Sequence, residues 1–519
     1  MLIESLRKYP MKILSNYLSM IYNLKVQAGM KLSATDNEDK NLLLKVLIPT
    51  LVGSFIAIVD ELIVNRIMLI NVPLPNFDII FALVASLLLL SPLLYILYLA
   101  IKARMRAKKI EDEIKYFIIS ESVIASASPN IIDDLTSLGK LHEIFSQLSK
   151  ESALLGRLRR LMTTPEVVHL YSKWVKSKFV GNLLSDFVFA QSLGIVRAWL
   201  KEKGGELLEE LRIDSLNKVK FRATISILFA VLLGYVPPIV LALSALMGGS
   251  VITKALTMTL ALCPIFFLVT PRTPRHFEVH YKKISRRYLL IIAIIVIILI
   301  LRCTILSLDE PKGIRVCFPY LLTVGGILTT LGLLQVSSIV SAVREARQLS
   351  KVLLTVIEAP LSVGNTLTIV KEAFNRTNYG FFKELSSKTN LLFMYPAVLG
   401  NARLWVTKFA VYTMMKGLTY GTLNRENLMR LRNLVNEMLR GFKLSLSTNT
   451  VVVTLALTLP LILNYVSALG DATVTPLSTL YMVMSSLIYS SYASYVVFNK
   501  VTNTLLPGAV CIELAFLLR

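Results

Sequence analysis

Long hydrophobic stretches alternate along the chain with two polar blocks, at 102–223 and 342–448. The hydrophobic stretches contain few charged residues, whereas the blocks are charged throughout. A transmembrane helix needs about 20 mostly apolar residues. The stretches that approach this length are 44–59, 79–101, 224–247, 255–270, 288–307, 318–341, 449–468, 476–498 and 502–518. The pattern predicts an all-α, polytopic membrane protein with about nine transmembrane helices.

Both polar blocks have the periodicity of amphipathic helices, without the alternation typical of strands. In the first block, the sequence at 164–166 marks a helix start, and Gly204 and Gly205 are expected to end a helix that begins near residue 183. In the second block, Asn424 is expected to cap a helix with one apolar stripe. Each block is therefore predicted to be a helical bundle.

The second block resembles a diverged copy of the first. Both contain a helix, a turn of small residues and a second helix, at an offset of about 237 residues. Five residues mark the turns of this repeat: Ala127, Pro129, Gly194, Gly364 and Asn365. Internal duplication explains the similarity, and chance similarity between two helical blocks is the alternative.

These features divide the chain into six parts. An N-terminal amphipathic segment, with a helix expected near 14–24, precedes a transmembrane hairpin, the first bundle, four transmembrane helices, the second bundle and three final transmembrane helices. Their predicted ranges are 1–43, 44–101, 102–223, 224–341, 342–448 and 449–519.

The distribution of positive charge predicts the topology. The net charge is +23, and Lys and Arg concentrate in 1–43, in both blocks and in the connector 271–287. Basic segments remain on the cytoplasmic side of a membrane. With nine spans, all of these segments lie on that side of the plasma membrane, with the N-terminus cytoplasmic and the C-terminus outside. No cleavable signal peptide is expected at the N-terminus.

No residue pattern points to catalysis, so we expect no enzyme activity and no cofactor. The chain has no phosphate-binding loop and no recognisable nucleophile–histidine–acid set. His276 and His280 have helical spacing, but only Glu278 could join them as a metal ligand, so no metal site is predicted. Cys303 and Cys317 could form a disulfide, although two separate buried cysteines are favoured.

Clusters of cations are the candidates for partner contact. The connector 271–287 carries six cations and one Glu, which is more positive charge than membrane insertion requires. The candidate contact residues are Arg157, Arg159, Arg160, Arg272, Arg275, Lys282, Lys283, Arg286 and Arg287. They could face an acidic protein surface or anionic lipid headgroups. Nucleic acid is not expected, because no basic motif is interleaved with aromatic residues.

Three segments of the first block carry a family resemblance: EIKYFII at 113–119, SASPNIIDDL at 126–135 and the glycine-containing helix sequence at 192–210. They resemble the type II secretion system F superfamily, the inner-membrane platforms of type II secretion, type IV pili and the archaellum. Ala127 stands where that family usually has glycine, and the second block matches less well. With four predicted spans between the blocks and nine in all, the chain is more similar to the archaeal platforms than to the bacterial ones, which have fewer spans.

The resemblance implies a membrane assembly platform for an archaeal type IV pilus-like filament or secretion machine. Such a platform docks a hexameric secretion ATPase, which hydrolyses the ATP, and couples it to pilin insertion at the filament base. The implied partners are this ATPase, pilin subunits, membrane lipids and a second copy of the chain, with a dimer favoured. A duplicated transporter is the alternative, because prolines at 237–238 and 460 could break helices at similar depths.

Overall fold

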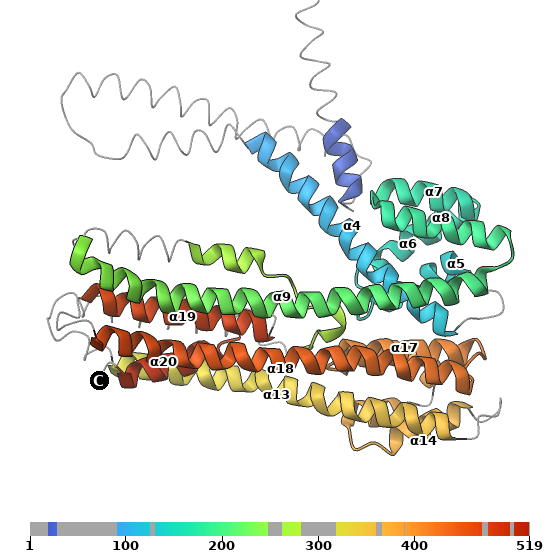
Figure 1. The fold of residues 1–519 in the computed structure, drawn as a ribbon. Helices are drawn as coiled ribbons and strands as arrows, with labels where there is room; N and C mark the ends of the chain where they lie inside the picture. The colour runs from blue at the N-terminus through green and yellow to red at the C-terminus, as the bar shows by residue number, and fades with distance from the viewer. Residues whose placement is uncertain are drawn as a thin grey trace, which may run out of the picture. The chain divides into compact units, whose positions relative to one another are not determined.

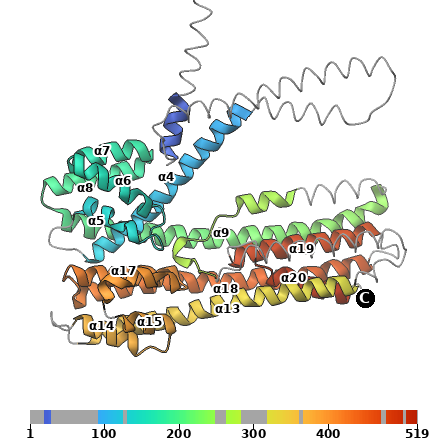
Figure 2. The same ribbon diagram turned by 180° about the vertical axis from the view of Figure 1, so that it is seen from behind.

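The computed structural model describes residues 19–28, 91–124, 130–247, 262–281, 318–359, 366–388, 390–469, 476–498 and 503–517. Within these ranges the secondary structure is helical, apart from one isolated β-bridge, which confirms the all-α prediction for this part of the chain. The chain divides into two compact units. The first comprises Met1–Ile118 and Ala127–Leu200, and the second comprises Ile119–Ser126 and Lys201–Arg519. Figures 1 and 2 show the helices of each unit.

The first unit is a bundle of short helices on one long helix. The long helix is α4 (Ser91–Ile124), and the bundle comprises α5 (Ile131–Ser137), α6 (Leu148–Leu161), α7 (Thr164–Val175), α8 (Lys178–Ser192) and the first turn of α9 (Val196–Met247). Apolar faces of all these helices form the core, where Phe117 meets Phe145 edge to face. The helices agree with the helical periodicity of this part of the sequence.

In this unit, side chains at the helix starts accept hydrogen bonds from backbone N–H groups that have no partner within the helix. Thr163 and Glu166 form a capping box at the start of α7, one residue before the predicted position. The hydrogen bonds from Thr163 lower the pKa of the Glu166 carboxyl. The side chain of Asn130 caps α5, whereas the predicted cap at 128–129 lies outside the described residues. Local sequence signals therefore locate helix starts to within one or two residues.

A short helix at 19–27 packs against α4 through apolar side chains of both helices. Its C-terminal end is held by Arg106 of α4, which donates to the carbonyl oxygens of Val26 at 3.0 Å and Gln27 at 2.8 Å. The same guanidinium forms a buried, bidentate ion pair with Glu151 of α6, at 2.9 and 2.6 Å. Arg106 thus ties three helices of the first unit together.

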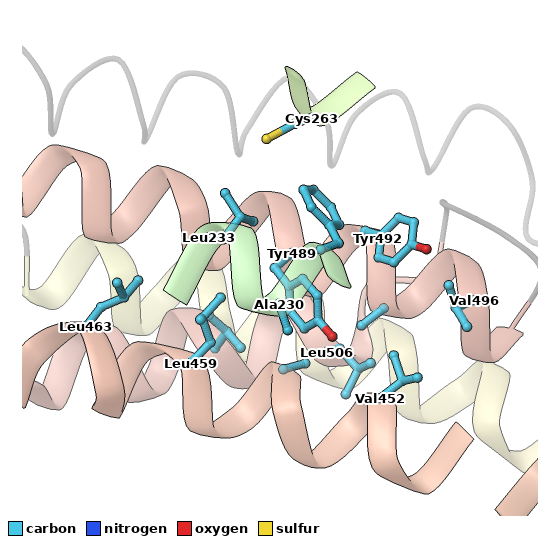
Figure 3. Close-up of a cluster of buried hydrophobic side chains, with 14 of the residues drawn as sticks. Ala230, Leu233, Cys263, Val452, Leu459, Leu463, Tyr489, Tyr492, Val496 and Leu506 are labelled. Carbon is cyan, nitrogen blue, oxygen red and sulfur yellow. The ribbon is translucent and has the colours of Figure 1, made fainter. Parts of the chain in front are cut away.

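Long helices dominate the second unit and run from polar into apolar sequence without interruption. From Lys201, α9 belongs to one bundle with α13 (Phe318–Glu358), α18 (Arg425–Leu469), α19 (Pro476–Phe498) and α20 (Leu505–Leu517), in which α9 and α13 lie on opposite sides (Figures 1 and 2). Their apolar parts surround a core that includes Leu233, Leu459, Tyr489 and Tyr492 (Figure 3). The helices that leave the polar blocks therefore continue directly into this apolar bundle.

The short helices of the second block are α14 (Thr366–Asn375), α15 (Gly380–Ser387), α16 (Leu391–Val398) and α17 (Trp405–Thr419). Every residue of α17 from Trp405 to Gly417 is buried, so this helix is covered on all sides. Asn424 caps α18 by accepting a hydrogen bond from the backbone N–H of Asn427 at 2.8 Å, as predicted. The predicted apolar stripe of α18 is buried.

The structure corrects the helix boundary predicted at Gly204 and Gly205. Both glycines lie inside α9, and the helix break comes earlier, at Gly194. A glycine inside a helix costs only about 1 kcal/mol relative to alanine. Two such costs do not end a helix as long as α9.

The nine predicted spans are only partly represented. Among the described residues, two helices are long and apolar enough to cross a membrane, Pro319–Glu358 and Arg425–Tyr465. Two others, Met482–Phe498 and Leu505–Leu517, are shorter. The ninth predicted span, at 502–518, forms a helix of 13 residues, well below the usual spanning length. The predicted spans at 44–59 and 288–307 lie outside the described residues, as do residues 79–90 and 255–261 of two further predicted spans.

Candidate functional site

The two helical blocks contain the same turn before the helix that leads into the apolar bundle. Gly194 follows α8 with φ +71°, and Gly421 follows α17 with φ +63°. In each turn the next backbone N–H reaches back five residues, from Ile195 to Ala190 at 3.0 Å and from Thr422 to Gly417 at 2.9 Å. This hydrogen bond is typical of the Schellman motif at helix ends. The glycine, the donor and the acceptor of the first turn are each separated by the same number of residues from their counterparts in the second turn. Gly194 was expected as a repeat marker, whereas its counterpart Gly421 was missed.

Each block also contains a buried glutamate that closes the start of a neighbouring helix. Glu113 of α4 accepts hydrogen bonds from the backbone N–H groups of Gln147 and Leu148, where α6 begins, at 2.8–3.0 Å. Glu345 of α13 accepts from those of Arg403 and Leu404, where α17 begins, at 2.9 and 3.1 Å. A carboxylate in this position accepts hydrogen bonds from N–H groups that lack a partner within the helix. Its negative charge also interacts favourably with the positive end of the helix dipole. The pair fixes how the long helix of each block meets its bundle.

Two features of its environment shift the pKa of Glu345 in opposite directions. Burial raises the pKa of the carboxyl, and its hydrogen bonds with the backbone of Arg403 and Leu404 and with the Tyr379 hydroxyl act in the opposite direction. Burial near the carboxylate also raises the pKa of Tyr379, whose hydroxyl donates to Glu345 at 2.9 Å. Glu345 has a structural role, because its carboxylate oxygens accept hydrogen bonds from residues of its own block.

The predicted basic connector is folded against the second block over its described part, 271–281. Val279 forms an antiparallel bridge with Leu404, and the backbone N–H of Trp405 donates to the carbonyl of Glu278 at 3.2 Å. The Arg275 guanidinium lies 5.7 Å from the centre of the Trp405 ring. Arg275 is therefore half-buried in internal packing, and only Arg272 is exposed among the described connector cations. Lys282, Lys283, Arg286 and Arg287 lie outside the described residues.

His276 is an internal residue of the connector. Its Nε2 lies 3.2 Å from the Ser215 hydroxyl of α9, and its ring meets Phe277 edge to face. Burial, followed by the nearby charge of Lys218, lowers the pKa of His276 to about 3. The described residues contain no group of three His, Cys, Asp or Glu side chains that could hold a metal ion. His276 therefore packs as a neutral side chain.

The remaining candidate cations lie on α6. Arg159 forms an ion pair with Asp133 of α5, with Nε and Oδ1 3.0 Å apart, so it connects two helices of the bundle. Arg157 and Arg160 are exposed and share a helix face with Lys150, Ala153 and Leu161. We call these five residues, Lys150, Ala153, Arg157, Arg160 and Leu161, the α6 face.

An exposed leucine distinguishes the α6 face from an ordinary solvated surface. Leu161 is 81% exposed, and Met162 beside it is 38% exposed. Arginine and methionine are enriched at protein interfaces, so the α6 face is a candidate for a protein contact. Sequence reasoning found the arginines but missed Leu161, although its place at the end of a basic helix was a usable signal. The turn residues Ala127, Pro129, Gly364 and Asn365 lie outside the described residues.

Comparisons of the chain with protein-family models, curated proteins and solved structures give no significant match. Three features of the described residues bear on function: two helical blocks with matching turns, continuous helices that lead from each block into an apolar bundle, and the cationic α6 face.

Proposed function

We propose that the chain is a membrane assembly platform of an archaeal type IV pilus-like filament or secretion machine. In this proposal its helical blocks lie in the cytoplasm, dock a hexameric secretion ATPase and couple it to pilin insertion at the filament base. The observation that carries the proposal is the continuity of α9 and α18. Each helix starts in a polar block and continues into the apolar bundle, so an unbroken helix joins block and bundle in both halves of the chain.

The proposed placement is a multi-pass protein of the plasma membrane with nine spans. The two long apolar helices Pro319–Glu358 and Arg425–Tyr465 support a membrane location. The concentration of Lys and Arg in the blocks supports a cytoplasmic position for both, with the N-terminus inside and the C-terminus outside. A homodimer is part of the proposal, because platforms of this type act at the base of a multi-subunit filament.

The α6 face is the surface proposed to meet the ATPase. Its cations attract an acidic surface, and Leu161 supplies an apolar contact at its end. In the second block, the second short helix, α15, has eight residues and presents Lys383 with Glu384 rather than a row of cations. The two blocks are thus expected to hold different partners.

A pull-down with a co-expressed secretion ATPase tests the proposal. The wild-type chain, purified in detergent, is expected to retain the ATPase, and Arg157→Glu with Arg160→Glu is expected to reduce the retained amount at least tenfold. Arg197→Glu, an exposed position of α9 in the same unit, is the matched control and should bind normally. Wild-type protein that retains no secretion ATPase would contradict the platform function.

A duplicated transporter is the second candidate, and the prolines identified in the sequence bear on it. Transporters of that kind bind their substrates at broken helices. Pro460 lies inside α18, which continues to Leu469, and α9 continues through positions 237–238 to Met247. Helices that continue through both sites favour the platform. Solute uptake into proteoliposomes by the purified chain would instead favour the transporter.

A further inference from the structure

The C-terminal turn of α19 is held by side chains from three other elements. The last four carbonyl groups of a helix have no partner within it. In α19 these belong to residues 495–498. We call this turn, together with Arg222 of α9, Tyr281 of the connector and Asn449 of α18, the α19 joint.

Arg222 makes the largest contribution to the joint. It is 4% exposed, and its Nη2 donates to the carbonyl oxygens of Tyr495 at 3.3 Å and Val496 at 2.5 Å. Its Nη1 donates to the carbonyl of Pro271 at 2.9 Å and the hydroxyl of Thr273 at 2.8 Å. One guanidinium therefore links α9, the connector and α19. A cation at the C-terminal end of a helix is also favoured by the helix dipole.

The remaining carbonyls of the turn receive neutral donors. Asn449 Nδ2 donates to the carbonyl of Val497 at 3.3 Å, and the Tyr281 hydroxyl donates to that of Phe498 at 3.0 Å. Asn449 belongs to α18, which comes from the second block, whereas Arg222 belongs to α9, which comes from the first. The two long helices thus meet α19 through different residues of the same turn.

The joint has space beside it. A cavity of about 90 Å³ is lined by side chains of the joint, Tyr281 and Asn449, together with Phe277, Phe442 and residues 496–498. Two of the three donors of the joint, Tyr281 and Asn449, therefore lie beside open space, whereas Arg222 does not line the cavity.

We propose that the α19 joint couples the two helical blocks to the membrane bundle, with Arg222 as the coupling residue for the first block and Asn449 for the second. A displacement of α9 is passed to α19 through Arg222, and a displacement of α18 is passed through Asn449. This inference deepens the proposed platform function by naming the element on which both blocks act. It depends on the two-block architecture and not on the identity of the docked partner.

Spin-label distances in the purified full chain in liposomes test the coupling. Spin labels are attached at exposed positions in two separate pairs, Leu228 of α9 with Met484 of α19, and Leu461 of α18 with Met484. The four native cysteines are replaced by alanine. Arg222→Gln is expected to broaden the 228–484 distance distribution at least twofold and to leave the 461–484 distribution unchanged. Asn449→Ala is expected to have the converse effect.

Two further variants make the result decisive. Lys220→Gln removes a positive charge from an exposed position of the same turn of α9 and should leave both distributions unchanged. Arg222→Lys keeps the positive charge but loses the second donor nitrogen, so we expect it to broaden the 228–484 distribution less than Arg222→Gln. It serves as the test variant if Arg222→Gln does not fold. The proposal is overturned if the Arg222 variants leave the 228–484 pair unchanged, or if Arg222→Gln and Asn449→Ala broaden both pairs equally. No ATPase is needed, so failure here is distinguishable from failure of the pull-down.

Discussion

Glu121 near the end of α4 and Lys416 in α17 form a buried ion pair, although 295 residues separate them in the sequence. The two side chains are 3% and 8% exposed. Beside them, the Asn427 amide donates to the carbonyl of Ile124 at 3.3 Å. The last residues of α4 therefore belong to the second unit, where they cover α17.

Removal of one partner from this pair should destabilise the second unit strongly. A lone charge left in a buried site costs about 3–5 kcal/mol, whereas an apolar pair of similar volume is nearly neutral. Glu121→Leu and Lys416→Met should each lower the unfolding temperature in detergent, and the double variant should recover most of the loss. Additive losses in the double variant would show that packing, rather than the charge pair, holds this contact.

The matching turns at Gly194 and Gly421 should respond equally to alanine. Both have positive φ, and a Cβ carbon added at either position would have no atom within 4 Å, so the cost is backbone strain alone. We expect Gly194→Ala and Gly421→Ala each to lose about 1 kcal/mol of unfolding free energy, with asparagine tolerated better. Chemical denaturation of the full chain measures the loss.

Gly205 supplies the control for this comparison. It lies inside α9 with open space around it and no positive φ. Alanine there should stabilise the protein by about 0.5–1 kcal/mol, because a glycine in a helix costs conformational entropy. A stabilising effect at Gly194 or Gly421 would contradict the strained turns.

The contact between α13 and α20 depends on glycines of both helices, Gly325 and Gly332 on α13 and Gly508 on α20, where no Cβ can be placed without a clash. A Cβ at Gly332 would clash with the backbone of Leu505, and one at Gly508 would lie 2.5 Å from the backbone N of Thr329. Backbone atoms cannot move aside as a flexible side chain can. Gly332→Ala and Gly508→Ala should therefore each cost about 1–3 kcal/mol and separate the helices.

Gly326 is the matched position on the same helix, since a Cβ there has no neighbour within 4 Å. Gly326→Ala should leave the unfolding temperature unchanged or raise it slightly. Cysteine accessibility of α20, read with a membrane-permeant maleimide at Cys511, should rise in the Gly332 and Gly508 variants only. Equal accessibility in all three variants would mean that the close approach is dispensable.

Local patterns predicted the elements that one stretch of sequence determines. The cap at Asn424 and the start of α7 depend on residues within one turn of each other. The burial of α17 on all sides could not be predicted, because its covering residues Glu121 and Arg275 come from distant parts of the chain. Arg222 was missed for the same reason: its partners on α19 are separated from it by more than half of the sequence.

The connector cations show the same limit at the candidate site. Positive charge in 271–287 indicated an exposed partner surface, but Arg275 stacks on Trp405 within the second unit. On α6, the sequence grouped three arginines that the structure separates into one structural residue, Arg159, and two exposed ones. Composition gives the number of cations in a segment, and only packing decides which of them remain free for a partner.

His276 should make the second unit sensitive to acid. An imidazole free in solution has a pKa of 6.5, and burial lowers the pKa of His276 to about 3 in the folded chain. Above pH 6.5 the residue is neutral in both states and has no effect on stability. Between pH 6.5 and about 3 the unfolded chain takes up a proton that the folded chain excludes, so stability falls as the pH falls, by up to about 1.4 kcal/mol per pH unit.

His276→Gln retains a polar partner for Ser215 and removes this titration. Its unfolding temperature should therefore fall less steeply than that of the wild type between pH 6 and pH 4, a window set by the two pKa values of His276. His169→Gln on the exposed side of α7 is the control and should keep the wild-type slope. Parallel slopes for His276→Gln and the wild type would mean that water reaches the imidazole, and that the connector does not stay closed over α9 in solution.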